Sequence, residues 1–192
     1  MSARRVVMIS STARDLPEYR SGICIACERA GFEPNMMEKL PALDVDAIQA
    51  SLRLVDEAEV YVGVFAFRYG YVPKDDDISM IEMEYNRAVE RGMPRLIFFS
   101  HEDHPITAKD VETGPDAAKL TALKERIGPE RVAGFFKSLG ELRGEVITAL
   151  TTLARELDEA AAKGEATAAV VAKPHRREQV RADARGRYQP EG

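Results

Sequence analysis

Glu84 is the residue in this chain whose type and position most strongly suggest chemistry. It stands in the segment RYGYVPKDDDISMIEMEYNRAVER, residues 68–91. At about 100° per residue, a helix places Glu84 about 60° from Ile81 and about 40° from Ala88, so the carboxylate lies on the apolar face. A carboxylate in that position needs a partner or a function, and we treat Glu84 as the candidate catalytic residue.

Two other polar residues of this segment have a structural explanation. Ser79 and Glu82 match the S-x-x-E capping box, in which each side chain satisfies a backbone donor at the start of a helix. The pattern therefore predicts a structural cap made by Ser79 and Glu82. It leaves Glu84 unexplained.

Two polar turns could share a site with Glu84. SSTARD (residues 10–15) and RYGYVP (residues 68–73) each follow an apolar run. A hydroxyl-rich turn leading into a helix can hold a phosphate or carboxylate through backbone N–H groups and the helix dipole, and arginine adds charge-assisted bonds. The candidate ligand-binding residues are Ser10, Ser11, Thr12, Arg14, Asp15 and Arg68, with Tyr69 and Tyr85 as candidates to stack on a base.

These turns also allow a purely structural interpretation. The hydroxyls of residues 10–12 would cap the first helix, and Arg68 would pair with an acid such as Glu84. The sequence leaves both interpretations open.

The elements that must position these residues alternate between strands and helices. Apolar runs predict strands at residues 4–10, 32–36, 59–67, 95–99 and 132–135. Amphipathic spacing predicts helices at residues 15–31, 44–57, 79–92, 117–127 and 142–157. Residues 100–116 predict a long surface loop. This alternation predicts an α/β fold, a three-layer αβα sandwich with a mostly parallel five-stranded sheet.

The strand order decides where a site should lie. We expect the order 2-1-3-4-5, as in flavodoxin-like folds, in which ligands bind at the carboxyl ends of the strands beside the point where the order reverses. That point lies between the first and third strands, which lead into residues 10–15 and 68–73. The two turns and Glu84 should therefore converge on one crevice.

Composition limits the class of protein. With 192 residues, 45% of them hydrophobic, we expect an α/β domain at residues 1–160 and an Ala- and Arg-rich linker or tail, partly helical or disordered, at residues 161–192. The net charge of −5 combines +3 from residue 173 onward with −8 on the rest, so the main domain is not expected to bind nucleic acid. Two cysteines, the lack of a signal peptide and the lack of an apolar run near the roughly 20 residues of a membrane span predict a cytoplasmic chain without a membrane partner.

Two weaker patterns favour structure over chemistry. Cys24 and Cys27 have redox spacing but fall inside a predicted helix, where buried packing is the better interpretation. His101 and His104 lie in the long loop, and two histidines without further ligands are a weak metal signal. We predict no metal site.

Five segments together resemble the domain-of-unknown-function 4062 family (DUF4062) over roughly residues 4–155. They are MISSTARDLPEYR, MMEKLPA, VYVGVFAFRYGYVP, ISMIEMEYNRAVERGMPRLIFF and GFFKSLGEL. The resemblance implies an N-terminal module of larger bacterial signalling proteins, ahead of an NTPase module, some of them similar to phage-defence receptors. The chain has no G-x-x-x-x-G-K-[ST] phosphate loop, so we expect an isolated module or a short member.

The family's fold is similar to TIR domains and nucleoside deoxyribosyltransferases, which cleave N-glycosidic bonds with a glutamate on the helix after the third strand. That resemblance maps the glutamate onto Glu84, four residues before Ala88. The transferase pattern is not fully met: its threonine falls near Ile81, its lysine is Met93, and its acidic residue after the third strand is replaced at residues 68–69.

Two hypotheses from different classes follow. In the first, the chain is a signalling or effector module of a bacterial antiphage defence-type protein, a hydrolase that cleaves NAD or a nucleoside with Glu84 attacking the anomeric carbon or stabilising the transition state. In the second, it is a non-catalytic recognition or oligomerisation domain that binds a partner or nucleotide. Both predict a nucleotide ligand or a protein partner, including self-association. Neither requires a cofactor, since NAD or another nucleotide would be the substrate.

Overall fold

The computed structural model describes residues 4–12, 15–37, 46–130 and 132–162, together with short strands at 181–182 and 188–189. One sheet of five parallel strands forms the centre, in the order β2-β1-β3-β4-β5. Its strands are β1 (Val6–Ser11), β2 (Glu33–Asn35), β3 (Val60–Phe65), β4 (Arg95–Ser100) and β5 (Ala133–Phe136). The predicted αβα architecture and strand order are confirmed.

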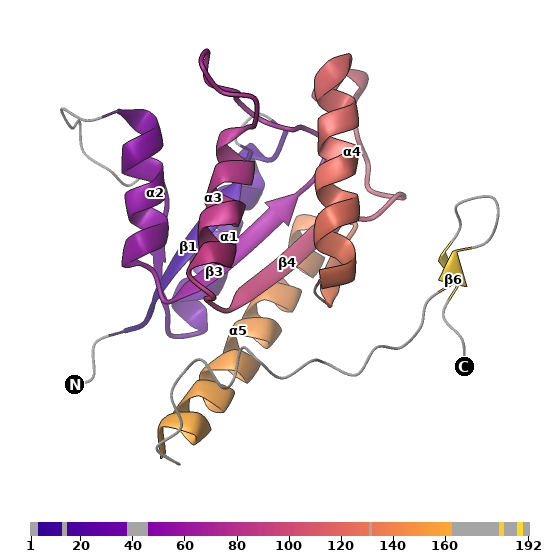
Figure 1. Ribbon diagram of the computed structural model, residues 1–192. Coiled ribbons are helices and arrows are strands. Elements are labelled where there is room, and N and C mark those ends of the chain that lie inside the picture. The colour runs from indigo at the N-terminus through magenta and orange to yellow at the C-terminus, as the bar shows by residue number, and fades with distance from the viewer. Residues whose placement is uncertain are drawn as a thin grey trace.

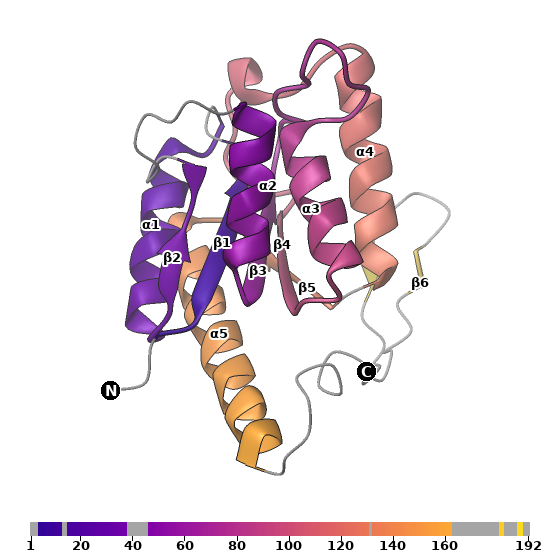
Figure 2. The ribbon, with the colours of Figure 1, turned by 60° about the vertical axis from the view of Figure 1, so that its left-hand side comes forward.

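Five α-helices cover the two faces of the sheet. They are α1 (Pro17–Arg29), α2 (Ala47–Glu57), α3 (Met80–Glu90), α4 (Pro115–Ile127) and α5 (Leu139–Ala162). Helices α1 and α5 lie on one face, and α2, α3 and α4 lie side by side on the other (Figures 1 and 2). Two 3₁₀ turns, η2 (Ala108–Asp110) and η3 (Gly128–Glu130), flank α4.

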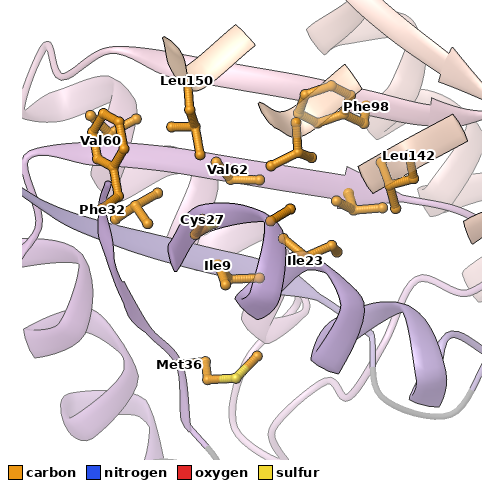
Figure 3. Close-up of a cluster of buried hydrophobic side chains, with 14 of the residues drawn as sticks. Ile9, Ile23, Cys27, Phe32, Met36, Val60, Val62, Phe98, Leu142 and Leu150 are labelled. Carbon is orange, nitrogen blue, oxygen red and sulfur yellow. The ribbon is translucent and has the colours of Figure 1, made fainter. Parts of the chain in front are cut away.

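The face under α1 and α5 is a core of buried aliphatic and aromatic side chains. Alternate strand residues such as Ile9 and Val62 meet Ile23 of α1 and Leu150 of α5 (Figure 3). Burying such side chains stabilises the fold by about 25 cal/mol for each Å² of apolar surface removed from water. This face is packed with buried hydrophobic side chains from the sheet and both helices.

The opposite face carries the buried tyrosines Tyr61, Tyr69 and Tyr85 and the candidate carboxylate. Tyr61 and Phe65 of β3 both pack edge-on against Tyr85 of α3. Gly63 lies between the two strand residues, and a Cβ there would come within 2.8 Å of the Phe65 ring. The absence of a side chain at Gly63 therefore lets the two rings close over the strand.

Most element boundaries differ from the predicted ones by a few residues. The second helix was expected from Asp44, which lies outside the described residues. Helix α2 begins at Ala47, because the Asp46 side chain caps it by accepting a hydrogen bond from Ile48 N at 2.5 Å. Strand β2 keeps only three of the five predicted residues, and the predicted loop at residues 100–116 contains η2 and the first two residues of α4.

The predicted capping box at the start of α3 does not form. Ser79 does stand at the N-cap, but its side chain makes no capping hydrogen bond. Glu82 instead accepts a hydrogen bond from the Tyr69 hydroxyl and forms a 2.7 Å ion pair with Arg126. Tertiary partners have replaced the local pattern.

The C-terminal boundary is only partly described. Helix α5 ends at Ala162, and most of the predicted tail at residues 161–192 lies outside the described residues. Residues 181–182 and 188–189 pair as antiparallel strands β6 (Arg181–Ala182) and β7 (Tyr188–Gln189). A domain boundary near residue 160 stays a prediction. Within the described part of the chain, none of the helices combines the length and apolar character needed to cross a bilayer.

Candidate functional site

A pocket of about 650 Å³ lies at the carboxyl ends of β1 and β3. Ser11 and Thr12 line it from the end of β1, and Glu84 lines it from α3. The segment after β3 contributes Arg68, Gly70, Tyr71 and Val72. This is the place where the strand order reverses, since β2 and β3 pair with opposite edges of β1. The two polar turns and Glu84 therefore share one cavity, whose volume falls in the range of small-molecule sites.

Glu84 is held at the wall of this pocket by two hydroxyl groups. Only 5% of the residue is exposed. Ser10 of β1 donates a hydrogen bond to Oε2, and Ser51 of α2 donates one to Oε1. These two bonds fix the rotation of the carboxylate, because each oxygen is tied to a different element.

Tyr61 adds a neutral aromatic neighbour to the carboxylate. It is fully buried on β3, on the same face of the sheet as Ser10. Burial first, and then the negative charge of Glu84, raise the pKa of the Tyr61 hydroxyl well above its usual value. The phenol therefore stays protonated beside the carboxylate at neutral pH.

The turn after β1 is tied to both neighbouring elements. Thr12 donates to the Asp15 carboxylate, and the other Asp15 oxygen accepts a 3.0 Å hydrogen bond from Phe67 N. Asp15 thus joins the end of β1 to the end of β3. It was predicted to bind the ligand, but it is not part of the pocket wall. Arg14, the other predicted ligand of this turn, lies outside the described residues.

Arg68 lines the pocket but has acidic and carbonyl partners of its own. It donates to the Lys109 carbonyl and lies 3.8 Å from a carboxylate oxygen of Glu112. Glu112 also accepts from Tyr69 N at 3.2 Å. The acid that pairs with Arg68 is therefore Glu112 and not Glu84, which the structural interpretation of the sequence had suggested.

The predicted stacking role of Tyr69 and Tyr85 is wrong. Both side chains are buried in the core beneath α3, so neither ring offers a free face to a base. Burial and a hydrogen bond to Glu82 raise the pKa of Tyr69 to about 12. The Tyr85 hydroxyl donates to Glu130 at 2.7 Å. Both rings are part of the hydrophobic core that packs against α3.

Three residues of the site were missed by sequence reasoning. Tyr71 is 70% exposed and lines the pocket, so it is the aromatic residue placed to meet a ligand. Arg20 of α1 lines the pocket while only 8% exposed, and its Nη1 donates to the carbonyl and hydroxyl oxygens of Ser11. Ser51 was detectable, because it precedes Leu54 and Val55 by three and four residues on the apolar face of α2.

The weaker patterns turn out to be parts of packed regions. Cys27 is buried in the core below α1 (Figure 3), and Cys24 lies 3.3 Å from the Met36 sulfur. His104 is enclosed by aromatic rings, and its Nε2 is 2.8 Å from the Tyr19 hydroxyl. Across residues 4–12, 15–37, 46–130 and 132–162, no cluster of three or more acidic, histidine or cysteine side chains could hold a metal ion.

Comparison with solved structures finds similar folds at low identity. A CMP N-glycosidase of Clostridium botulinum matches with 10% identity and a TM-score of 0.44, covering 74% of this chain and 98% of that one. TIR domains of the activated Roq1 resistosome match with 15% identity and a TM-score of 0.44, covering 79% and 84%. A 2-desoxiribosyltransferase from Leishmania mexicana matches with 15% identity and a TM-score of 0.37, covering 59% and 76%.

Comparison with curated proteins gives no match. The model of one family, described as Domain of unknown function (DUF4062), matches residues 6–151, which is most of the chain and the whole α/β sandwich up to α5. By that match, this chain belongs to the DUF4062 family.

Proposed function

We propose that this chain is a nucleotide-binding effector module that cleaves an N-glycosidic bond, with Glu84 as the catalytic carboxylate. The observation that carries the proposal is the position of Glu84. It is a buried carboxylate, oriented by Ser10 and Ser51, in the wall of a pocket of about 650 Å³. A pocket of this size accommodates a nucleotide.

The surroundings of Glu84 suit chemistry at an anomeric carbon. The two serine hydroxyls hold the carboxylate in one orientation and stabilise its charge, so it needs little reorganisation when positive charge develops on a sugar. In the reaction, the C1′–N bond breaks and its electron pair leaves with the base. The nicotinamide of NAD leaves as a neutral base, whereas the base of an ordinary nucleoside takes up a proton. Glu84 stabilises the resulting oxocarbenium-like centre or bonds to it, and water then adds at C1′ and releases a proton.

Tyr71 and the turn after β1 complete the proposed site. Tyr71 presents an exposed ring at the pocket, on which a base can stack. The hydroxyls of Ser11 and Thr12 line the same pocket and offer hydrogen bonds to the sugar or phosphate. NAD and nucleosides are the candidate substrate classes.

A specific observation also supports a second function, a non-catalytic module that binds a nucleotide or a partner. Both oxygens of Glu84 already accept hydrogen bonds from the protein, which a purely structural carboxylate would also do. Ile81 and Met93 stand where the transferase pattern has a threonine and a lysine. In this alternative, Glu84 joins α3 to β1 and α2, and the chain passes a binding signal to a protein partner or to further copies of itself in an antiphage response.

Hydrolysis assays on Glu84→Gln separate the two functions. The protein is incubated at high concentration, to favour assembly, with NAD and with nucleosides and their monophosphates, and release of the base is followed by chromatography. The substitution keeps the shape of the side chain and removes its charge. We expect it to lower the rate by at least about 100-fold, the scale of one electrostatic catalytic group.

The matched control is Glu90→Gln, which removes an exposed carboxylate from the same helix. Its activity should equal that of the wild type. Activity that survives Glu84→Gln would remove Glu84 from the mechanism. Absence of activity in the assembled wild type, together with retained nucleotide binding, would favour the non-catalytic module.

A further inference from the structure

Tyr61 is a tyrosine of β3 whose whole side chain, including the hydroxyl, is enclosed in the core beneath α3. Its hydroxyl oxygen is buried and makes no hydrogen bond of normal geometry with the described residues. A buried hydroxyl without a full partner destabilises a fold, because the group has lost its hydrogen bonds to water. A phenylalanine would fill the same space without that cost, so the hydroxyl of Tyr61 calls for an explanation.

The ring of Tyr61 leans along its own strand, over Gly63. A Cβ at Gly63 would lie 2.7 Å from Cε1 of this ring. Gly63 is the register partner of Ser10 on β1, and paired residues of neighbouring strands face the same side of a sheet. The phenol therefore ends near the Ser10 side chain.

The two hydroxyls are neighbours, although their contact falls short of normal hydrogen-bond geometry. Burial and then the charge of Glu84 raise the pKa of Tyr61 well above its usual value, and the Ser10 side chain opposes them. The phenol stays protonated at neutral pH, so it has a proton to donate. A small shift of either side chain is enough to complete a bond between them.

The protons of this group fix the direction of that bond. The Ser10 hydroxyl donates its single proton to Oε2 of Glu84. Toward Tyr61 its oxygen can therefore act only as an acceptor, and the phenol must be the donor. The result is a chain from Tyr61 through Ser10 to Glu84, in which each hydrogen bond polarises the next.

We propose that Tyr61 is a positioning residue for Glu84 and acts through Ser10. Its hydroxyl donates to the Ser10 oxygen, commits the Ser10 proton to Glu84, and so favours an ionised carboxylate in one orientation. Tyr61 is not among the residues that line the pocket, and it does not meet the substrate. This inference rests on the proposed function for its consequence in catalysis, because it takes Glu84 as the reacting carboxylate.

The test follows the titration of Glu84 itself and does not depend on turnover. The side-chain carboxyl carbon of Glu84 is observed by ¹³C NMR between about pH 4 and pH 9 in the intact chain, and its resonance is assigned with Glu84→Gln. Tyr61→Phe keeps the ring and removes only the hydroxyl. We expect it to raise the pKa of Glu84 by about one unit, since hydrogen bonds to a carboxylate favour its charged form.

The other ionisable groups around the chain are kept in this comparison. Tyr85 of α3 and Arg95 of β4 act on Tyr61, and the pocket wall adds two arginines and two carboxylates beside Glu84. They are Arg20, Arg68, Glu112 and Asp116. Because all of them are present in wild type and in Tyr61→Phe, the difference between the two titrations reports the Tyr61 hydroxyl.

A second background and a control assign the shift to this chain. In Ser10→Ala the link is absent, so adding Tyr61→Phe should move the titration of Glu84 no further. Tyr69→Phe removes another buried phenol hydroxyl, which donates to Glu82, and should leave Glu84 as in the wild type. Circular dichroism and thermal unfolding establish that each variant is folded.

An unchanged titration of Glu84 in folded Tyr61→Phe overturns the proposal, as does a carboxyl that keeps one protonation state across this pH range in every variant. A shift of equal size on the Ser10→Ala background also overturns it, because Tyr61 would then not act through Ser10. If the wild type hydrolyses a probe, Tyr61→Phe should lower kcat about tenfold with KM little changed. Failure of the proposed function is a separate result. A protein that hydrolyses nothing but shows the expected shift of Glu84 supports the chain from Tyr61 and contradicts the N-glycosidase.

Discussion

The Ser51 hydroxyl on α2 donates a hydrogen bond to the Glu84 carboxylate on α3, at the wall of the pocket. Helices α2 and α3 are neighbours on the same face of the sheet (Figure 2). Through Ser10, the same carboxylate also reaches β1. One buried side chain thus links three elements, so its role in stability and its role in chemistry can be measured separately.

Removal of the Ser51 hydroxyl tests the structural part of this link. Ser51→Ala should lower the free energy of unfolding by about 1–3 kcal/mol, the cost of a buried group that loses its partner. Urea unfolding of Ser51→Ala, Glu84→Gln and the double variant gives a double-mutant cycle. We expect the double variant to lose less than the sum of the single losses, because the two side chains share one bond.

Ser21→Ala serves as the control for this cycle. Ser21 is exposed on α1, and its hydroxyl donates a hydrogen bond to the carbonyl of Glu18 in the same helix. Its removal should change stability by no more than about 0.5 kcal/mol. Strict additivity between Ser51 and Glu84 would show that their hydrogen bond contributes nothing to stability.

Much of this fold could be predicted from the sequence because the strong signals are local. The continuous apolar run that contains β3 predicts a strand buried on both faces, and all six residues of β3 are buried. Helical geometry alone places Glu84 inward. The predicted crevice between the first and third strands is where the pocket lies.

The errors arise where tertiary contacts override a local pattern. A capping box requires Glu82 to turn back to its own helix, but Arg126 and the Tyr69 hydroxyl offer it stronger partners. The choice between Tyr69 and Tyr71 depends on the backbone of Gly70, whose φ of +91° turns the chain between them. No side-chain pattern in RYGY shows which tyrosine points inward.

Gly70 provides a second prediction. A Cβ at this position would be strained by φ +91° and would also lie 3.1 Å from Cγ2 of Thr12 in the pocket wall. Gly70→Ala should therefore lower the free energy of unfolding by about 1–3 kcal/mol and weaken ligand binding. Chemical unfolding and nucleotide titration measure the two effects.

Gly31 is a matched control for Gly70. Its φ is +86°, nearly the same, but a Cβ there would meet nothing within 4 Å. Gly31→Ala should show the backbone strain alone and leave nucleotide binding unchanged. Equal effects of the two substitutions on binding would mean that the contact between Gly70 and Thr12 does not shape the pocket.

Tyr71 gives a third prediction, in which nucleotide affinity changes and the stability of the fold does not. Because 70% of the residue is exposed, Tyr71→Ala should change the free energy of unfolding by less than about 0.5 kcal/mol. Loss of base stacking should weaken nucleotide binding by about 1–3 kcal/mol while binding of ribose 5-phosphate is unchanged. Tyr85→Ala, in the buried core, should instead destabilise the fold by about 3–5 kcal/mol. Unchanged nucleotide affinity in Tyr71→Ala would exclude it as the base platform.

Lys124 makes stability depend on pH in a direction opposite to that of a salt-bridged lysine. It lies on α4 and donates to the carbonyl of Ala66, just after β3. Burial lowers its pKa to about 8, although the negative charge of Asp15 opposes the shift. The unfolded chain, with a normal lysine pKa of 10.5, then holds more protons than the folded chain between about pH 8 and pH 10.5.

It follows that the contribution of Lys124 to stability rises as the pH increases through this window, by at most about 3 kcal/mol. Below pH 8 the folded state bears the full cost of a half-buried ammonium group, and above pH 10.5 both states are neutral. Urea unfolding of wild type and Lys124→Met at pH 7, 8, 9 and 10 isolates this term, because other titrating groups cancel in the difference. Lys119→Met, which removes a partly exposed lysine from the same helix, controls for loss of charge. The difference in free energy of unfolding between wild type and Lys124→Met could instead stay constant from pH 8 to pH 10. That result would show that the Lys124 amine is well solvated and that its hydrogen bond to Ala66 does not bury a charge.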